Sequence, residues 1–148
     1  MIVSMQIVSP VDIEDAIRLD LTEMYARAGI DDVSFSAMPV PPSLGELPAA
    51  GALVCIRRVG GSRTELVSDV HAVSIDVYAP TWSESIAEAN RVAGMACAMP
   101  YQEGLSLQYH AAQMTNQPVE LPDTSNPTLP RVRVAISFSV KGDIIEMS

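Results

Sequence analysis

The chain has 148 residues, 48% of them hydrophobic, with 18 acidic against nine basic side chains and a formal net charge of −9. This length suits a single domain with its own core, and the acidic balance disfavours a protein that grips nucleic acid by its phosphates. Two distant cysteines, Cys55 and Cys97, favour free thiols over a disulfide, and the sequence shows no signal-peptide pattern and no apolar run long enough for a membrane span.

The first expected element is a helix over about residues 10–28. Ser9 is a suitable N-cap, Pro10 suits the first helical position, and Gly29 follows as a C-cap. Apolar residues recur at spacings of three and four and form one stripe, namely Ile13, Ala16, Ile17, Leu21 and Met24.

A short strand and a long proline-rich loop are expected next. Val33 and Phe35 favour a strand, whereas residues 38–50 hold too many prolines to continue a helix or a central strand. Such loops are often functional or docked on a neighbour, and a plain surface loop is the alternative. Three residues of this loop are candidate interface residues: Pro41, Pro42 and Leu44.

The segment "ALVCIRRVGGSR" is interpreted as a strand over residues 52–59 followed by a turn. Gly60 and Gly61 lead into a second strand-like run, residues 65–79, which predicts a hairpin. A phosphate-binding loop would instead need a helix after its glycines. The second strand alternates, with His71, Val73, Ile75 and Val77 on one face and Ala72, Ser74, Asp76 and Tyr78 on the other.

Two adjacent arginines, Arg57 and Arg58, are expected to point to opposite faces of the first strand, so they do not form one basic patch. Edge protection or solvation is one explanation for them. Contact with acidic surfaces of neighbouring subunits is the other. Arg63, at the end of the expected turn, joins them as a candidate contact.

A second helix is expected over about residues 82–99. Thr81 and Glu84 match a capping box, and small residues at helical spacing would let the helix lie close to a sheet. Two strands follow, over residues 105–118 and 131–142, separated by a proline-rich loop over residues 118–130. The last strand alternates most clearly, with five apolar residues from Val132 to Val140 on one face and Arg131 and Arg133 on the other.

The tail, residues 142–148, is short and is expected to be an arm that docks on another molecule. From the last third of the chain, the candidate interface residues are Leu121, Asp123, Arg131, Ile144 and Ile145. Together these elements predict a single α+β domain with a mostly antiparallel sheet and two main helices packed on one face.

Catalytic, metal-binding and cofactor-binding residues are not predicted. His71 and His110 lie in separate expected strands without a placed partner, and no metal-ligand spacing or nucleophile motif occurs in the sequence. A small-molecule-binding module or an enzyme of unknown type stays an alternative. A deep cleft that combined Arg57, Asp76 and His110 would favour that alternative.

The middle and end of the chain resemble the tail terminator proteins of long-tailed phages, particularly those that infect actinobacteria. The matching motifs are a strand that ends in an arginine-containing V-G-G turn, an alternating strand that ends in an aromatic residue and alanine, a capped helix start, and a late "LPD…PR" segment. These are Val59–Gly61, the run from Val73 to Ala79, Thr81, Glu84, Leu121–Asp123, Pro130 and Arg131. The chain departs from the family in its proline-rich loop over residues 38–50.

The resemblance implies a structural virion protein with no enzymatic activity and no cofactor. Such a subunit forms a homohexameric ring that caps the tail tube, ends tube polymerisation and joins the tail to the head-completion proteins. DNA passes through the lumen without specific binding, and an acidic lumen would let it slide. The implied location is the tail or neck of a virion assembled in the host cytoplasm, away from any membrane. A head-closure or tail-completion protein of the same neck is the nearest alternative.

Overall fold

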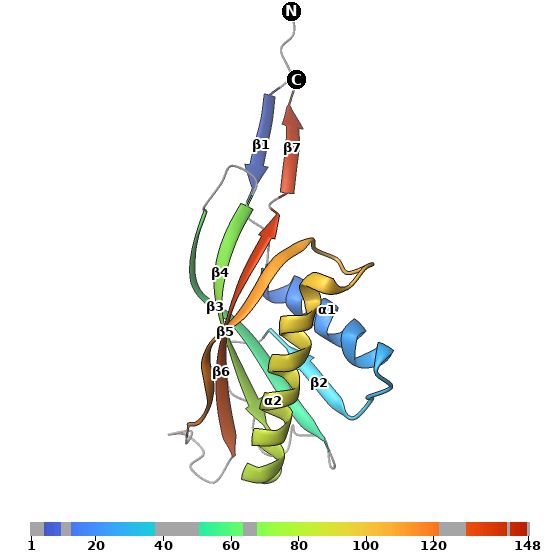
Figure 1. Ribbon diagram of the computed structural model, residues 1–148, viewed down its shortest axis with the longest axis vertical. Coiled ribbons are helices and arrows are strands. Elements are labelled where there is room, and N and C mark those ends of the chain that lie inside the picture. Colours follow the sequence, from blue (N-terminus) through green and yellow to red (C-terminus); the bar gives the residue numbers. More distant parts are fainter. Residues whose placement is uncertain are drawn as a thin grey trace, which may run out of the picture.

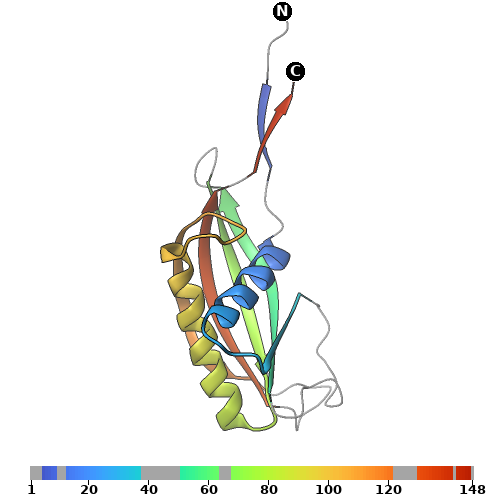
Figure 2. The same cartoon turned by 90° about the vertical axis from the view of Figure 1, so that its right-hand side faces the viewer.

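The computed structural model describes residues 5–9, 13–37, 51–63, 68–121, 130–141 and 143–147, and within them five strands form one sheet with two α-helices on one face (Figures 1 and 2). Across the sheet the strands are β2 (Val33–Ser36), β3 (Ala52–Arg63), β4 (Ser68–Tyr78), β6 (Arg131–Lys141) and β5 (Tyr109–Glu120). Strand β2 pairs with β3 in parallel, and the other neighbouring pairs are antiparallel. The expected α+β class is confirmed.

Helix α1 (Ile13–Arg27) packs its apolar stripe on the sheet. Ile17 and Leu21 are fully buried because residues three and four apart share one side of a helix. Gly29 follows the helix with a φ of 75°, as expected for a C-cap glycine. The predicted first residues of this helix, 10–12, lie outside the described residues.

Helix α2 (Trp82–Ala98) lies beside α1 on the same face of the sheet (Figure 2). The predicted N-cap is confirmed, since Thr81 Oγ1 accepts a hydrogen bond of 3.2 Å from the backbone N–H of Glu84. Alanines at positions 89 and 96 are fully buried, and their small side chains let the helix approach the strands closely. A short 3-10 turn, η2 (Met99–Tyr101), follows the helix.

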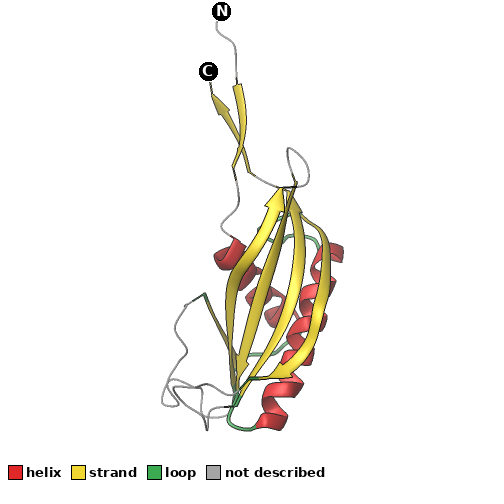
Figure 3. Cartoon of the chain, turned by 90° about the vertical axis from the view of Figure 1, so that its left-hand side faces the viewer, coloured by secondary structure: helices red, strands yellow, loops and turns green. Residues whose placement is uncertain are grey.

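The core fills the space between the two helices and the inner face of the sheet. In Figure 3 the strands lie in front and both helices lie behind them. The alternating residues of β4 and β6 meet the helices there, as predicted, and the largest contributors are aliphatic or aromatic. The most deeply buried side chains of β3, β4 and β6 are each at most 1% exposed and include Val54, Ile56, Ile75, Val77, Val134, Ile136 and Phe138.

Strand β3 is longer than predicted and contains both glycines. Gly60 pairs with Ala72 and Gly61 pairs with His71, so the expected turn at this point is wrong. A register shift between Arg58 and Gly60 marks a β-bulge, which lets the ladder continue past the glycines. The segment 64–67 lies outside the described residues.

Strand β5 begins and ends later than predicted, so residues 105–108 are not part of a strand. It forms one edge of the sheet, and its register with β6 shifts at three places. Pro118, predicted to open a loop, lies inside the strand. Of the expected proline-rich loop, residues 122–129 lie outside the described residues.

A separate two-stranded antiparallel ribbon is formed by β1 (Met5–Ser9) and β7 (Asp143–Met147). It extends beyond the end of the main sheet, away from both helices (Figures 1 and 3). Ser9 pairs with Asp143 in this ribbon. Residues 10–12, between Ser9 and the first described residue of α1, lie outside the described residues, so the predicted Ser9 cap stays a prediction. The expected C-terminal tail is therefore a strand over most of its length.

Candidate functional site

The outer face of the sheet, opposite the helices, carries a charged network around Asp76. Arg133 lies directly across from Asp76 on the neighbouring strand, and its Nε and Nη2 donate hydrogen bonds of 2.7 and 3.1 Å to the two carboxylate oxygens. Arg131 Nη1 lies 3.9 Å from the same carboxylate. The hydrogen bond to Asp76 raises the pKa of Arg133. The network thus holds two arginines in fixed positions on this face.

Cys55 and Tyr78 are buried beside this network and pack with Leu53. Burial, and secondarily the Asp76 carboxylate, raises the pKa of the Cys55 thiol to about 11. Burial also raises the pKa of the Tyr78 hydroxyl. Both groups are therefore protonated at neutral pH, and a protonated, buried thiol is a poor nucleophile.

A groove of about 340 Å³ continues from the network towards the edge strand β5; we call it the β5–β6 groove. Its surface is mainly apolar, and Val119 within it is 53% exposed. Arg131 fixes one end, because its Nε donates to the carbonyl oxygen of Leu121 at 3.1 Å and its own carbonyl oxygen accepts from Leu121 N–H at 2.8 Å. The lining residues are Asn116, Gln117, Val119, Leu121, Arg133 and Ala135.

The structure separates the two adjacent arginines of β3. Arg58 makes two hydrogen bonds on the helix side of the sheet. Its Nε donates to His71 Nδ1 at 2.9 Å, and its backbone N–H donates to Glu14 Oε1 on α1 at 2.8 Å. Burial, followed by the charge of Arg58, lowers the pKa of His71. Arg57 is exposed and lies across from Ser74 in the strand register. Arg58 therefore has a structural role within one copy, which the sequence did not indicate.

The other predicted interface residues are scattered. Leu121 and Arg131 meet at the β5–β6 groove. Arg63 lies at the end of β3, and Ile144 and Ile145 lie in β7. Four predicted residues lie outside the described residues: Pro41, Pro42, Leu44 and Asp123.

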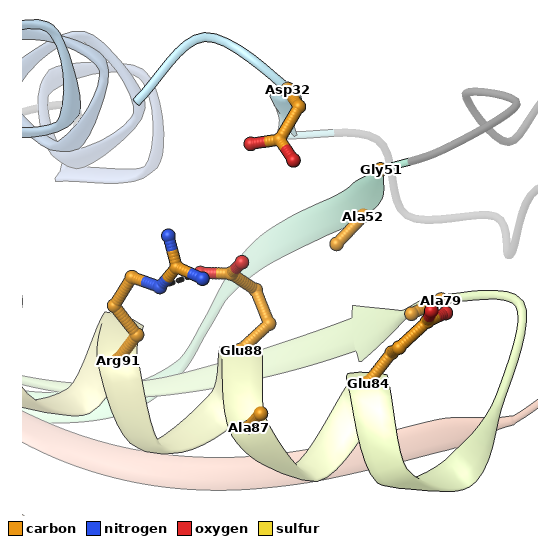
Figure 4. A pocket seen from close by; sticks show the side chains of 8 residues that line it. All are labelled: Asp32, Gly51, Ala52, Ala79, Glu84, Ala87, Glu88 and Arg91. Carbon is orange, nitrogen blue, oxygen red and sulfur yellow. Dashed lines mark ion pairs between the residues drawn. The ribbon is translucent and has the colours of Figure 1, made fainter. Parts of the chain in front are cut away.

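A second, acidic cleft of about 190 Å³ lies between α2 and the start of β3 (Figure 4). Asp32 reaches it from one side, and Glu84, Glu88 and Arg91 reach it from α2. Glu88 is already engaged, since it accepts a hydrogen bond of 2.6 Å from Tyr25 Oη and lies 3.3 Å from Arg91 Nε. In the part of the chain that the structure describes, no three His, Cys, Asp or Glu side chains are grouped to hold a metal ion.

The three groups whose convergence would indicate a catalytic cleft do not all lie on neighbouring strands. Arg57 is on β3, Asp76 on β4 and His110 on β5, and β4 and β6 separate β3 from β5. Three strand spacings amount to roughly 14 Å. The arrangement therefore gives the enzyme alternative no support from these residues.

Two buried carboxylates were missed by the sequence analysis. Asp20 on α1 accepts hydrogen bonds from Ser106 N–H, Ser106 Oγ and Tyr109 Oη at 2.7, 2.9 and 2.6 Å. Glu88 on α2 is the other. Each lies on the apolar side of its helix, three residues after Ile17 and one residue before Ala89. An acidic residue inside an apolar stripe was the available signal for a buried, hydrogen-bonded carboxylate.

No protein-family model matches the chain, and no curated protein matches it in sequence. Its fold is similar to that of a chain in a solved structure described as the virion of a native gene transfer agent particle, with a TM-score of 0.57 and 18% identity. The match covers 88% of this chain and 95% of that one. At this identity the likeness establishes a shared fold. Within the described residues, no helix has the length and apolar character needed to cross a bilayer.

Proposed function

We propose that this chain is a structural subunit of a phage-type particle and acts there as the tail terminator. The observation that carries the proposal is the likeness to a chain of a gene transfer agent virion, which extends over nearly the whole of both chains. The sequence motifs that resemble tail terminators support the finer assignment. Those within the described residues lie on β3, β4, the start of α2 and the start of β6, although the V-G-G segment is part of a strand and not a turn. Pro122 and Asp123 lie outside the described residues. In this proposal the protein acts by assembly, without a chemical step.

The ring would form from copies of this chain, cap the end of the tail tube and present its other side to the head-completion proteins. The charge of the chain suits this role. With a net charge of −9, a lumen lined by such subunits would repel the phosphate backbone, so DNA would pass through without being held. The homohexamer, the tube protein and the head-completion protein are the partners of this proposal.

A tube-growth assay tests the proposed function. Tail tube protein from the same particle is allowed to polymerise alone or with this chain, and tube lengths and end density are measured by electron microscopy. We expect shorter tubes whose ends carry a ring with six-fold symmetry. Tubes of unchanged length with bare ends would contradict tail termination. Binding to the head-side connector in place of the tube would favour the head-closure alternative.

A further inference from the structure

Both edges of the main sheet are poorly suited to extension by a strand from another copy. Edge strand β5 has three register shifts relative to β6 and contains Pro118, which lacks an N–H donor. The opposite edge, β2, has four residues. Bulges, proline and short length are the features by which edge strands avoid pairing. Copies of this chain therefore need another surface for mutual contact.

The β1–β7 ribbon offers such a surface. A two-stranded ribbon is at best marginally stable alone in water, and this one stands apart from the main sheet in all three views of the chain (Figures 1, 2 and 3). Its register sets apolar residues against each other in three of five pairs: Met5 with Met147, Ile7 with Ile145, and Val8 with Ile144. A ribbon of this apolar sequence that stands apart from the sheet is a candidate for docking on a partner.

The β5–β6 groove matches the ribbon in chemistry. The groove is mainly apolar and contains the exposed Val119. Its charged lining residue is Arg133, whose side chain is 40% exposed and already paired with Asp76. Arg131 lies near the same carboxylate, so two arginines share one aspartate and one positive charge is left over at this end of the groove. The ribbon sequence holds two acids, Asp143 and Glu146, and no basic residue. Apolar contact and opposite charge thus favour the same pairing.

The two surfaces lie at opposite ends of β6, so they cannot meet within one copy. The groove includes Arg133 and Ala135 near the start of β6, and the ribbon follows Lys141 at its end (Figure 1). At about 3.4 Å per residue, roughly 20 Å of strand separates Ala135 from Lys141, and the ribbon points away from the groove. A ribbon can therefore reach only the groove of another copy.

We propose that the β1–β7 ribbon of one copy docks in the β5–β6 groove of the next. This inference rests on the proposed function, because it specifies the contact by which the ring subunits join. The contact is heterologous, with different surfaces on the two copies, and repeated rotation of such a contact closes a ring. It also gives the otherwise isolated ribbon a partner.

Two variants and their mixture test the contact. Ile145→Asp alters the ribbon, and Val119→Asp alters the groove. In sedimentation velocity, each variant alone should associate at least about tenfold more weakly than the unchanged protein, as expected when a central apolar contact is lost. Mixed together, they should form a dimer that grows no further, because one intact ribbon and one intact groove remain. Leu19→Asp, at a site on α1 that is 48% exposed, is the matched control and should assemble normally.

A disulfide test reports on the same contact without depending on assembly strength. On a Cys97→Ser background, Ile145→Cys and Val119→Cys proteins are mixed and oxidised, and a cross-linked heterodimer is expected. Circular dichroism shows whether each variant keeps its fold.

The outcomes separate the two proposals. If the unchanged protein forms a closed oligomer and both Asp variants do so equally well, the ribbon-in-groove contact is overturned and the proposed function stands. If the unchanged protein stays monomeric and does not bind tube ends, both proposals fail. A mixture of variants that remains monomeric also contradicts a heterologous contact.

Discussion

Gly61 occupies a backbone conformation that favours glycine, with a φ of 149° inside a paired strand. A Cβ at this position would overlap the carbonyl oxygen of Val70 on the partner strand. We therefore expect Gly61→Ala to lower the free energy of unfolding by about 1–3 kcal/mol. Gly60→Ala is the matched control, because no heavy atom lies within 4 Å of a Cβ placed there. Urea denaturation measures both, and equal stabilities would contradict the argument.

The two arginines of β3 should respond differently to charge reversal. Arg58→Glu removes the donor to His71 Nδ1 and places a carboxylate near Glu14, so we expect a loss of about 1–2 kcal/mol in unfolding free energy. Arg57→Glu should leave stability unchanged, because Arg57 is exposed on the outer face. Thermal denaturation compares them. If Arg57→Glu then weakens oligomer formation, Arg57 contributes to the interface, and normal assembly removes it from the candidates.

The Cys55 thiol predicts a pH dependence of stability. Its pKa is raised from 9.0 to about 11 by burial and then by Asp76, so above pH 9 the unfolded chain loses this proton while the folded chain keeps it. Stability then falls as the pH rises from 9 towards 11. The loss should be about 1 kcal/mol by about pH 10. Urea denaturation of the unchanged protein and of Cys55→Ala isolates the effect, and a stability difference that stays constant with pH would disprove it.

Between elements, a buried hydrogen bond connects the two helices. Tyr25 Oη on α1 donates to Glu88 on α2 at 2.6 Å, and burial, followed by this bond, raises the pKa of Tyr25. Tyr25→Phe leaves the Glu88 carboxylate without that donor in a buried site, so we expect a loss of about 2 kcal/mol in unfolding free energy. Tyr101→Phe, at a residue 85% exposed, should have no effect.

A double-mutant cycle with Glu88→Met, which has no carboxylate or amide oxygen to accept from Tyr25, tests whether the loss comes from that hydrogen bond. The two changes should be strongly non-additive, because each removes the same contact. Additive losses would mean that Tyr25 stabilises the helices through packing. One such contact is its edge-to-face arrangement with Phe35, whose ring centroid lies 4.9 Å from that of Tyr25.

The helices and strands were predicted well where the residues that determine them lie close together in the sequence. The Thr81 cap, the Gly29 C-cap and the alternation of β6 depend on neighbours a few residues away, and each was confirmed. Gly60 and Gly61 look like a turn locally, but pairing with β4 keeps them in a strand. Likewise, β1 was not predicted, because a strand of five residues forms there only by pairing with β7 at the other end of the chain.

The candidate site was predictable only in part for the same reason. Leu121 and Arg131 were selected from the sequence as interface residues, and the structure places them in contact with each other. Their contact with another molecule stays a prediction. The partner of Arg133 could not be foreseen, because the Asp76–Arg133 pair depends on the register between β4 and β6. The groove depends on where β5 ends beside β6. The predicted strand ended at residue 118, whereas β5 continues to Glu120.

At the scale of the whole molecule, the charge of the chain makes a prediction about DNA. A net charge of −9 should prevent phosphate binding, so we expect no shift of a short DNA duplex at about 10 µM protein and physiological salt, where non-specific binders act. An electrophoretic mobility assay at several salt concentrations measures this. Salt-sensitive binding at lower protein concentration would contradict a lumen that lets DNA slide.

The pairing of β1 with β7 has a practical consequence for work with this protein. Because the two strands lie side by side, a fusion partner or purification tag attached before one or after the other would crowd the same pole of the molecule. Moving the tag from one terminus to the other would not relieve the obstruction. Oligomer measurements should therefore use protein from which any tag has been cleaved.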